Sequence, residues 1–306
     1  MEKAKKTKSI YYKFLGKTYI KSDSVVGAVF ILPAVVLGAI FVIAPMVVSL
    51  SYAFTDANLL KLNEVGWAGL RQFKKAFTDR FMWNAFKNTM IFVVKVVPLQ
   101  LLAALGLALI LNTKIRGNTF FRWAFFCPVM LSLAVTSFLW MNLLNPEEGL
   151  INALLKVFHI PPQPFLESPK QAMNVIVVIS AWQGAGYQML IFLSGLKNIP
   201  PELYEAAGVD GAGSGTKFFR ITLPSILPTF SFVLVTMLIG AFRLMTQPMI
   251  MTQGGPTDST MTMSYYIYQQ GIKYRDVGYS SAIALLYTLF MSTVALTLRK
   301  VTDQKD

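Results

Sequence analysis

Six long apolar stretches constrain the fold of this chain more than any other feature. A helix needs about 20 apolar residues to cross a bilayer, and each stretch is long enough. They cover Val25–Ala53, Met90–Leu111, Thr119–Leu144, Ala172–Leu196, Ser225–Met251 and Gly278–Leu298. Backbone polar groups cannot stay unpaired in lipid, so each stretch should be helical. The sequence therefore predicts an all-α integral membrane protein with six transmembrane helices.

The composition agrees with a membrane protein. Hydrophobic residues make up 54% of the 306 residues and charged residues only 14%, whereas soluble proteins carry about 25% charged residues. The first stretch is too long for the core of a signal peptide, and no small-residue cleavage site follows it. Cys127 is the only cysteine, which excludes an intrachain disulfide and a cysteine-based metal site. We expect the first stretch to remain in the protein, and we expect no metal site.

The distribution of Lys and Arg predicts the orientation, because cytoplasmic segments of membrane proteins carry an excess of both. The formal net charge is +13, and the N-terminal segment is rich in lysine: Lys3, Lys5, Lys6, Lys8, Lys13, Lys17 and Lys21. Such a segment also attracts anionic lipid headgroups. We expect a basic cytoplasmic segment over 1–24, a permease domain over 25–298 and a cytoplasmic tail over 299–306. Both termini and the loop 197–224 would then lie on the cytoplasmic side.

The loop 197–224 is polar and rich in small residues, although it lies between two apolar stretches. Pro200 and Pro201 can begin a helix, the glycines from Gly208 onward should end it, and Ser214 could cap a second short helix. We therefore expect a helix, a turn and a helix. Residues with almost no side chain would let the backbone of a partner approach closely.

The same loop carries a specific pattern, Glu-Ala-Ala-x3-Gly-x9-Ile-x-Leu-Pro, starting at Glu205 and ending at Pro224. It resembles the cytoplasmic EAA loop of bacterial ABC importer permeases, which have a MetI-like core of six helices. In that family the loop docks into a separate ATPase subunit. The resemblance therefore assigns ATPase coupling to Glu205, Ala206, Ala207, Gly208, Asp210 and Gly211.

Three further segments are similar to the carbohydrate-uptake branch of these permeases, the MalF- and UgpA-type proteins. They are Asn88-Thr89, Asn145-Pro146 with Gly149-Leu150-Ile151-Asn152, and Thr252-Gln253-Gly254-Gly255-Pro256. The resemblance implies a non-enzymatic subunit in the bacterial cytoplasmic membrane. Its expected partners are ABC ATPase subunits, a second homologous permease and an extracytoplasmic solute-binding protein. The cargo would be a sugar, an oligosaccharide or a related polar solute.

No cofactor is expected in the chain itself, because ATP would be bound by the partner ATPase subunits. Gly16-Lys17-Thr18 looks like the end of a phosphate-binding loop. That loop needs a glycine five positions before its second glycine, and this position is Tyr11.

Polar and aromatic residues inside the apolar stretches are candidates for a solute pathway, because intramembrane polar residues usually face a bundle interior or a cavity. Sugars are bound by hydrogen bonds to their hydroxyls and by aromatic faces against their C–H groups. Residues of these types are Trp140, Trp182, Gln183, Tyr187, Arg243 and Gln247. Arg243 and Gln247 are expected on one helical face together with Thr236 and Gly240. Hydrogen bonding between helices is the alternative role.

Two other classes of membrane protein are alternatives to an importer. A membrane-embedded enzyme acting on lipid-linked sugars would need a cluster of acid, base or metal-binding residues, yet the chain has one His and one Cys. An ion-coupled secondary transporter usually needs Asp or Glu inside its spans, and the six stretches contain neither. An ATP-driven importer is favoured over both.

Overall fold

The computed structural model describes residues 11–14, 17–20, 23–61, 64–113 and 116–303. The chain divides into two compact units, residues 1–52 and 53–306. The first unit holds a short antiparallel hairpin of β1 (Tyr11–Phe14) and β2 (Lys17–Ile20). The sequence did not predict this hairpin. Most of the N-terminal lysines used to predict orientation lie outside the described residues.

A membrane-length helix follows in the first unit. It is built from α1 (Asp23–Gly38), the π-helical turn η1 (Ala39–Ile43) and α2 (Ala44–Tyr52). Its apolar part runs from Gly27 to Tyr52 without a break. This confirms the first predicted span.

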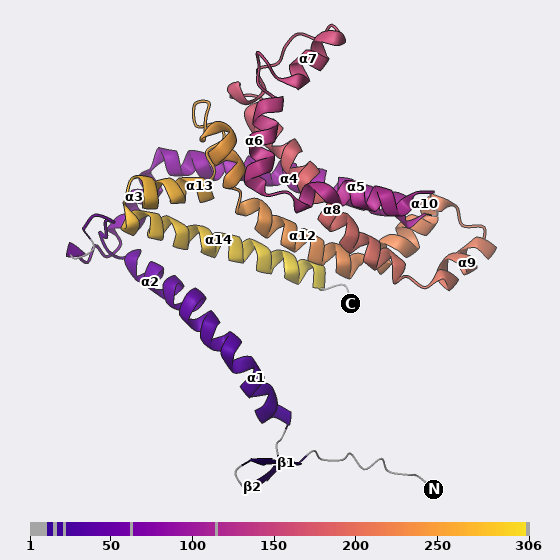
Figure 1. Cartoon of the computed structure of the whole chain (residues 1–306), viewed down its shortest axis with the longest axis horizontal. Helices are drawn as coiled ribbons and strands as arrows, with labels where there is room; N and C mark the ends of the chain where they lie inside the picture. Colours follow the sequence, from indigo (N-terminus) through magenta and orange to yellow (C-terminus); the bar gives the residue numbers. More distant parts are fainter. Residues whose placement is uncertain (1–10, 15–16, 21–22, 62–63, 114–115, 304–306) are drawn as a thin grey trace. The chain divides into compact units, whose positions relative to one another are not determined.

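All named elements of the second unit are helices in its described part, and two isolated β-bridges lie in its loops. Its longest helices are α4 (Arg80–Asn112), α8 (Ala172–Lys197), α12 (Leu227–Phe242) and α14 (Val277–Asp303). Figure 1 shows that α3 and α13 lie at one end of this bundle, and that α9 and α10 lie at the other. The shorter elements are α3 (Arg71–Thr78), α5 (Asn118–Met130), α6 (Leu133–Leu143), α7 (Leu150–Val157), η3 (Phe165–Glu167), α9 (Pro201–Val209), α10 (Ser214–Lys217), η4 (Phe218–Thr222), α11 (Leu223–Ser225), η5 (Pro248–Thr252), α13 (Met263–Tyr268) and η6 (Gln269–Lys273).

The number of spans agrees with the prediction once broken helices are included. Four helices of the described residues are long and apolar enough to cross a membrane, and two bent pairs raise the number to as many as six. The helices α4, α8 and α14 confirm the second, fourth and sixth predicted spans.

The third predicted span, Thr119–Leu144, is not one continuous helix. It consists of α5 and α6, which meet at an angle of 97°. Pro128 lies in the last turn of α5, where it removes a backbone donor. The hydroxyl of Ser132 accepts a hydrogen bond from the N–H of Ala134 and so caps the start of α6. The uninterrupted helix expected here was wrong because both residues favour a break.

The fifth predicted span, Ser225–Met251, is also interrupted. The helix α12 ends at Phe242, and Arg243 is its C-cap residue. Side chains from other elements satisfy the carbonyl groups that the break releases. The carbonyl of Phe242 accepts hydrogen bonds from Ser264 and Tyr287, and that of Leu244 accepts one from Thr262. The expectation of one helical face through residues 243 and 247 was therefore wrong, because no helix connects them.

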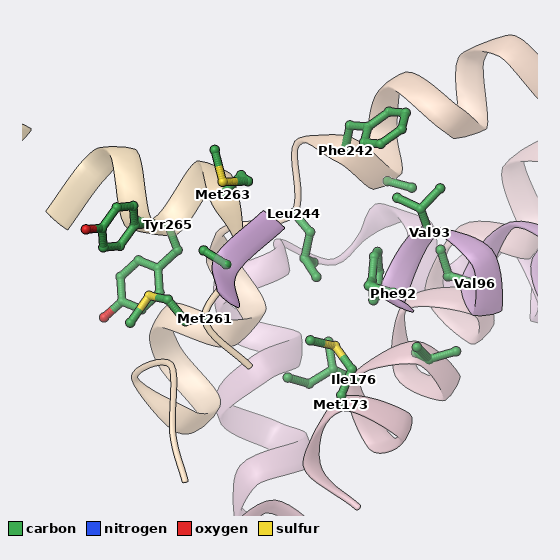
Figure 2. Close-up of a cluster of buried hydrophobic side chains, with 14 of the residues drawn as sticks. Phe92, Val93, Val96, Met173, Ile176, Phe242, Leu244, Met261, Met263 and Tyr265 are labelled. Atoms are coloured by element: carbon green, nitrogen blue, oxygen red, sulfur yellow. The ribbon is translucent and has the colours of Figure 1, made fainter. Parts of the chain in front are cut away.

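The core of the second unit forms where α4, α8, the end of α12 and the segment around α13 meet. Figure 2 shows Phe92, Val96, Ile176, Leu244 and Met263 in this cluster. The helices α4 and α8 pack along each other, and α8 also crosses α5. A Cβ atom at Gly186 would lie 2.1 Å from the carbonyl oxygen of Phe125. Only glycine at this position allows the two helices to come so close.

A carboxylate ties the start of α4 to α13 and α14. Asp79 caps α4 and accepts hydrogen bonds from the N–H of Phe81 at 2.9 Å, the hydroxyl of Tyr266 at 2.5 Å and the hydroxyl of Tyr279. Burial alone would raise the pKa of Asp79. The hydrogen bonds from both tyrosines and from the N–H groups of Phe81 and Met82 outweigh burial and hold that pKa below its ordinary value. Asp79 is therefore ionised in the folded protein at neutral pH.

We predict that Asp79→Asn destabilises the protein by about 1–3 kcal/mol, because both tyrosines lose a charged acceptor. The folded pKa of Asp79 is depressed, so its contribution is complete at neutral pH and is lost only as the pH falls through that value. Thermal unfolding of the purified complex at neutral pH measures the difference. Glu147→Gln is the matched control, since this exposed carboxylate accepts no hydrogen bond among the described residues. Equal stability of wild type and Asp79→Asn would contradict the role given to Asp79.

Candidate functional site

A cavity of about 390 Å³ lies among α4, α8, the α5–α6 break and the end of α12. Both interrupted spans border it: Leu131 and Leu133 come from the first break, and Arg243 and Leu244 from the second. In membrane transporters, interrupted helices commonly surround the solute site. The cavity therefore has the location expected of a solute pathway.

Four of the six predicted pathway residues line this cavity: Gln183, Tyr187, Arg243 and Gln247. Arg243 and Gln247 come together here although the helix between them is interrupted. Arg243 is exposed, whereas Gln247 is only 4% exposed. Within the described part of the chain, neither side chain has a hydrogen-bond or ion-pair partner.

Gln183 is held differently from the other three. Its amide nitrogen donates to the carbonyl of Leu131 at 3.2 Å and to the hydroxyl of Thr136 at 3.1 Å. Leu131 is the C-cap of α5, so Gln183 connects α8 to the break between α5 and α6. Its amide oxygen is buried and unpaired. This geometry gives Gln183 a structural task at the cavity wall.

Trp140 and Trp182 do not line this cavity. Their rings pack edge to face, with centroids 5.5 Å apart. Trp140 borders a separate groove of about 410 Å³ with Gln171, Asn174 and Val178. The structure thus divides the predicted pathway set into four residues at one cavity and two elsewhere.

Two glutamines that line the cavity were missed by the sequence analysis, as was Thr246. Gln100 of α4 donates to the side-chain oxygen of Gln188 on α8 at 3.0 Å. Gly184 makes room for this contact, because a Cβ atom there would lie 2.2 Å from the amide nitrogen of Gln100. A glutamine inside an apolar stretch is the signal that could have identified both.

The loop 197–224 has the expected helix, turn and helix. The first helix is α9, and the second is α10 continued by η4. Gly211 lies in the turn with φ +72°, and a Cβ atom added to it would meet nothing within 4 Å. The hydroxyls of Tyr204 and Thr222 are 2.8 Å apart and join the two helices. The N-cap of α10 is Gly213 and not Ser214, because Ser214 is already helical.

Glu205, Ala206, Gly208, Asp210 and Gly211 are all exposed, and Ala207 is half-buried. Two apolar side chains are exposed on the same loop: Val209 is 90% exposed and Phe219 67%. The loop therefore exposes small, acidic and apolar groups.

The family-like segment Asn88-Thr89 is hydrogen-bonded to residues that follow the segment 252–256, at the opposite end of the bundle. The amide nitrogen of Asn88 donates to the carbonyls of Asp258 at 2.7 Å and Met261 at 3.0 Å. The hydroxyl of Thr89 accepts from the N–H of Met263 at 2.9 Å. These bonds attach the stretch that follows Pro256 to α4.

Comparison with known proteins identifies the family. Residues 88–305 match the family of the binding-protein-dependent transport system inner membrane component. The chain belongs to this family. It is thus a multi-pass inner-membrane permease subunit of a binding-protein-dependent ABC importer, and such a subunit is not catalytic.

Individual relatives agree. The chain is 37% identical to the probable ABC transporter permease protein YesP of Bacillus subtilis, over 93% of this chain and 92% of the relative. It is 32% identical to the arabinooligosaccharides transport system permease protein AraP of the same species, over 78% and 77%. A bacterial ABC transporter that imports the acidic polysaccharide alginate has the same fold, with a TM-score of 0.81, 24% identity, and 92% and 96% coverage.

We predict that Gln183→Leu and Tyr187→Phe act in different ways. Gln183→Leu leaves the carbonyl of Leu131 without its donor and should lower the stability by about 1–3 kcal/mol. Tyr187 is 50% exposed and its hydroxyl has no hydrogen-bond partner in the described residues, so Tyr187→Phe should leave stability unchanged. Thermal unfolding of the two purified variants makes the comparison. A stable Gln183→Leu variant would show that the tie to α5 is not needed.

Proposed function

We propose that this permease carries a sugar, an oligosaccharide or a related polar solute, and that the cavity bordered by both helix breaks is its pathway. The observation that carries the proposal is the position of Gln183, Tyr187, Arg243 and Gln247 around one cavity. The relative AraP, named for arabinooligosaccharides, supports the solute class. In this proposal Trp140 and Trp182 act along the same pathway but outside the cavity.

The proposed assembly contains ABC ATPase subunits, a second homologous permease and an extracytoplasmic solute-binding protein. The ATPase subunits bind ATP, and this chain needs no cofactor. Membrane lipid surrounds the permease domain 25–298, with the basic segment 1–24 and the tail 299–306 at its ends. The exposed surface of loop 197–224 supports a contact with an ATPase subunit, because small residues allow close approach and Val209 and Phe219 offer apolar area.

The direct test of this function is ATP-dependent uptake by the complete assembly in proteoliposomes. Radiolabelled solute recognised by the binding protein should accumulate with ATP and not without it. Uptake that continues without ATP would support the ion-coupled alternative. Conversion of the solute to a new product would support the membrane-embedded enzyme.

We predict that both termini and loop 197–224 are cytoplasmic. The loop lies at the other end of the bundle from α3 and α13 (Figure 1), so the two ends should face opposite sides of the membrane. Single cysteines at Ser214 and Glu148, both exposed, in a Cys127→Ala background should react from opposite sides. A membrane-impermeant thiol reagent applied to intact cells should label only the cysteine at 148. Labelling at both positions would contradict the proposed orientation.

We predict that Gly211→Val weakens coupling to the ATPase, whereas Gly211→Asn preserves it. The backbone at Gly211 has φ +72°. This conformation costs an L-residue about 1–2 kcal/mol and is visited routinely only by glycine, asparagine and aspartate. Co-purification of the ATPase should fall up to about tenfold for Gly211→Val, with normal membrane insertion.

Glu205→Lys should have the same effect by reversing a charge on α9, with Glu205→Gln as the milder control. Wild-type co-purification by both disruptive variants would exclude this loop as the docking element.

A further inference from the structure

The cavity bordered by the two helix breaks has a lone charge. Arg243 is its only charged lining residue, and neither Asp nor Glu lines it among the described residues. The ion pairs of the described residues all lie elsewhere, at Lys61–Glu64, Arg71–Asp56 and Lys75–Asp276. A guanidinium at membrane depth without a counter-ion is unfavourable. A group from outside the described residues must therefore interact with it.

We propose that the cavity selects solutes that carry an anionic oxygen group, a carboxylate, sulfonate or phosphate, beside hydroxyl groups. Arg243 binds the anionic group. The inference rests on the proposed function, because it identifies the substrate class of the same cavity.

A structural explanation for Arg243 would be that it caps the end of α12, where cations interact favourably with the helix dipole. The last carbonyl groups of that helix already have other donors. Gly240 accepts from the N–H of Arg243, and Ala241 accepts from the N–H of Leu244. The carbonyl of Phe242 accepts from two hydroxyls. The guanidinium donates to none of them, so its donors remain available.

The neighbouring lining residues suit the hydroxylated part of such a solute. The amide of Gln247 and the hydroxyl of Tyr187 have no hydrogen-bond partners in the described part of the chain, and both can donate and accept. A guanidinium binds a carboxylate or phosphate through two parallel donors. The volume of about 390 Å³ lies within the range of small-molecule sites, roughly 300–1,000 Å³. The cavity thus combines one anion-binding group with neutral groups that bind hydroxyls.

The charge preference can be measured without knowing the solute. A cysteine replaces Thr246, which lines the cavity, in a Cys127→Ala background of the assembled importer. Two small thiol reagents then label it, the anionic 2-sulfonatoethyl and the cationic 2-(trimethylammonium)ethyl methanethiosulfonate. We compare the labelling rate of the anionic reagent with that of the cationic reagent. The ratio of the two rates should fall on the order of tenfold when Arg243→Gln is added, because the charge of Arg243 attracts the anionic reagent and repels the cationic one. Arg243→Lys should preserve the ratio.

A cysteine at Ser214 is the control site, since Ser214 begins α10, which precedes α12 in the chain, whereas Arg243 caps the C-terminal end of α12. Its ratio should not respond to Arg243→Gln. A ratio at Thr246 that is equally unresponsive would overturn the proposal, because the charge would then be neutralised by another subunit or by the bulk solvent.

Protection from labelling tests solute binding itself. Galacturonate should slow the labelling of the cysteine at 246, and galactose at the same concentration should not. The protection should disappear in Arg243→Gln and weaken in Arg243→Lys, which keeps the charge but loses the two parallel donors. Equal protection by both sugars would show that the cavity does not select anions. If uptake did not require ATP but galacturonate still protected the cysteine selectively, the proposed ATP-driven function would be wrong. The anion-binding site would still be supported.

Discussion

The need to pair every backbone polar group in lipid governs this structure. An interrupted helix is tolerated at membrane depth only where other groups satisfy the freed carbonyls. Ser264 and Tyr287 do so for Phe242, Thr262 does so for Leu244, and Gln183 does so for Leu131. These side chains come from α8, α14 and the segment around α13. The interruptions therefore exist because residues far away in the sequence support them.

The interruptions border the site. A continuous α12 would extend past Phe242 and keep Arg243 and Gln247 on one helical face, one turn apart. Both side chains reach one cavity with Gln183 and Tyr187 although the helix is broken, and residues of both breaks line that cavity. Gln183, which satisfies a carbonyl freed by the first break, also lines the cavity. Neighbouring residues of the cavity wall therefore have different tasks. Gln183 is hydrogen-bonded to the first break, whereas the hydroxyl of Tyr187 has no partner among the described residues and is available to a solute.

The sequence predicted the spans well where apolar length alone decides, as in α4, α8 and α14. It did not predict the breaks at Leu131 and Arg243. Pro128 and Ser132 were local signals of the first break that the analysis did not use. The cost of the second break depends on partners such as Tyr287, 45 residues from Phe242. Gln100 and Gln188 could have been identified as glutamines inside apolar stretches, but their pairing follows only from the packing of α4 on α8. The turn at Gly211 was predictable because its requirement is local. The division of Trp140 and Trp182 from the other pathway residues depends on the 97° bend, which spacing along a helix cannot reveal.

One continuous stretch links the loop of the proposed ATPase contact to the proposed pathway. The hydroxyls of Tyr204 and Thr222 join α9 to η4, and the helical segment ending at Ser225 meets α12 at 67°. The 16 residues of α12 then span about 24 Å at 1.5 Å per residue and end at Arg243. A movement of α9 would act on α12 at one end and on the charged lining residue of the cavity at the other. The carbonyls of Phe242 and Leu244 are hydrogen-bonded to α14 and to the segment around α13. We therefore expect such a movement to change the position of Arg243 relative to Gln247, because these bonds restrain the break between the two residues. We infer that the break in α12 is the point at which coupling motion and solute contact meet.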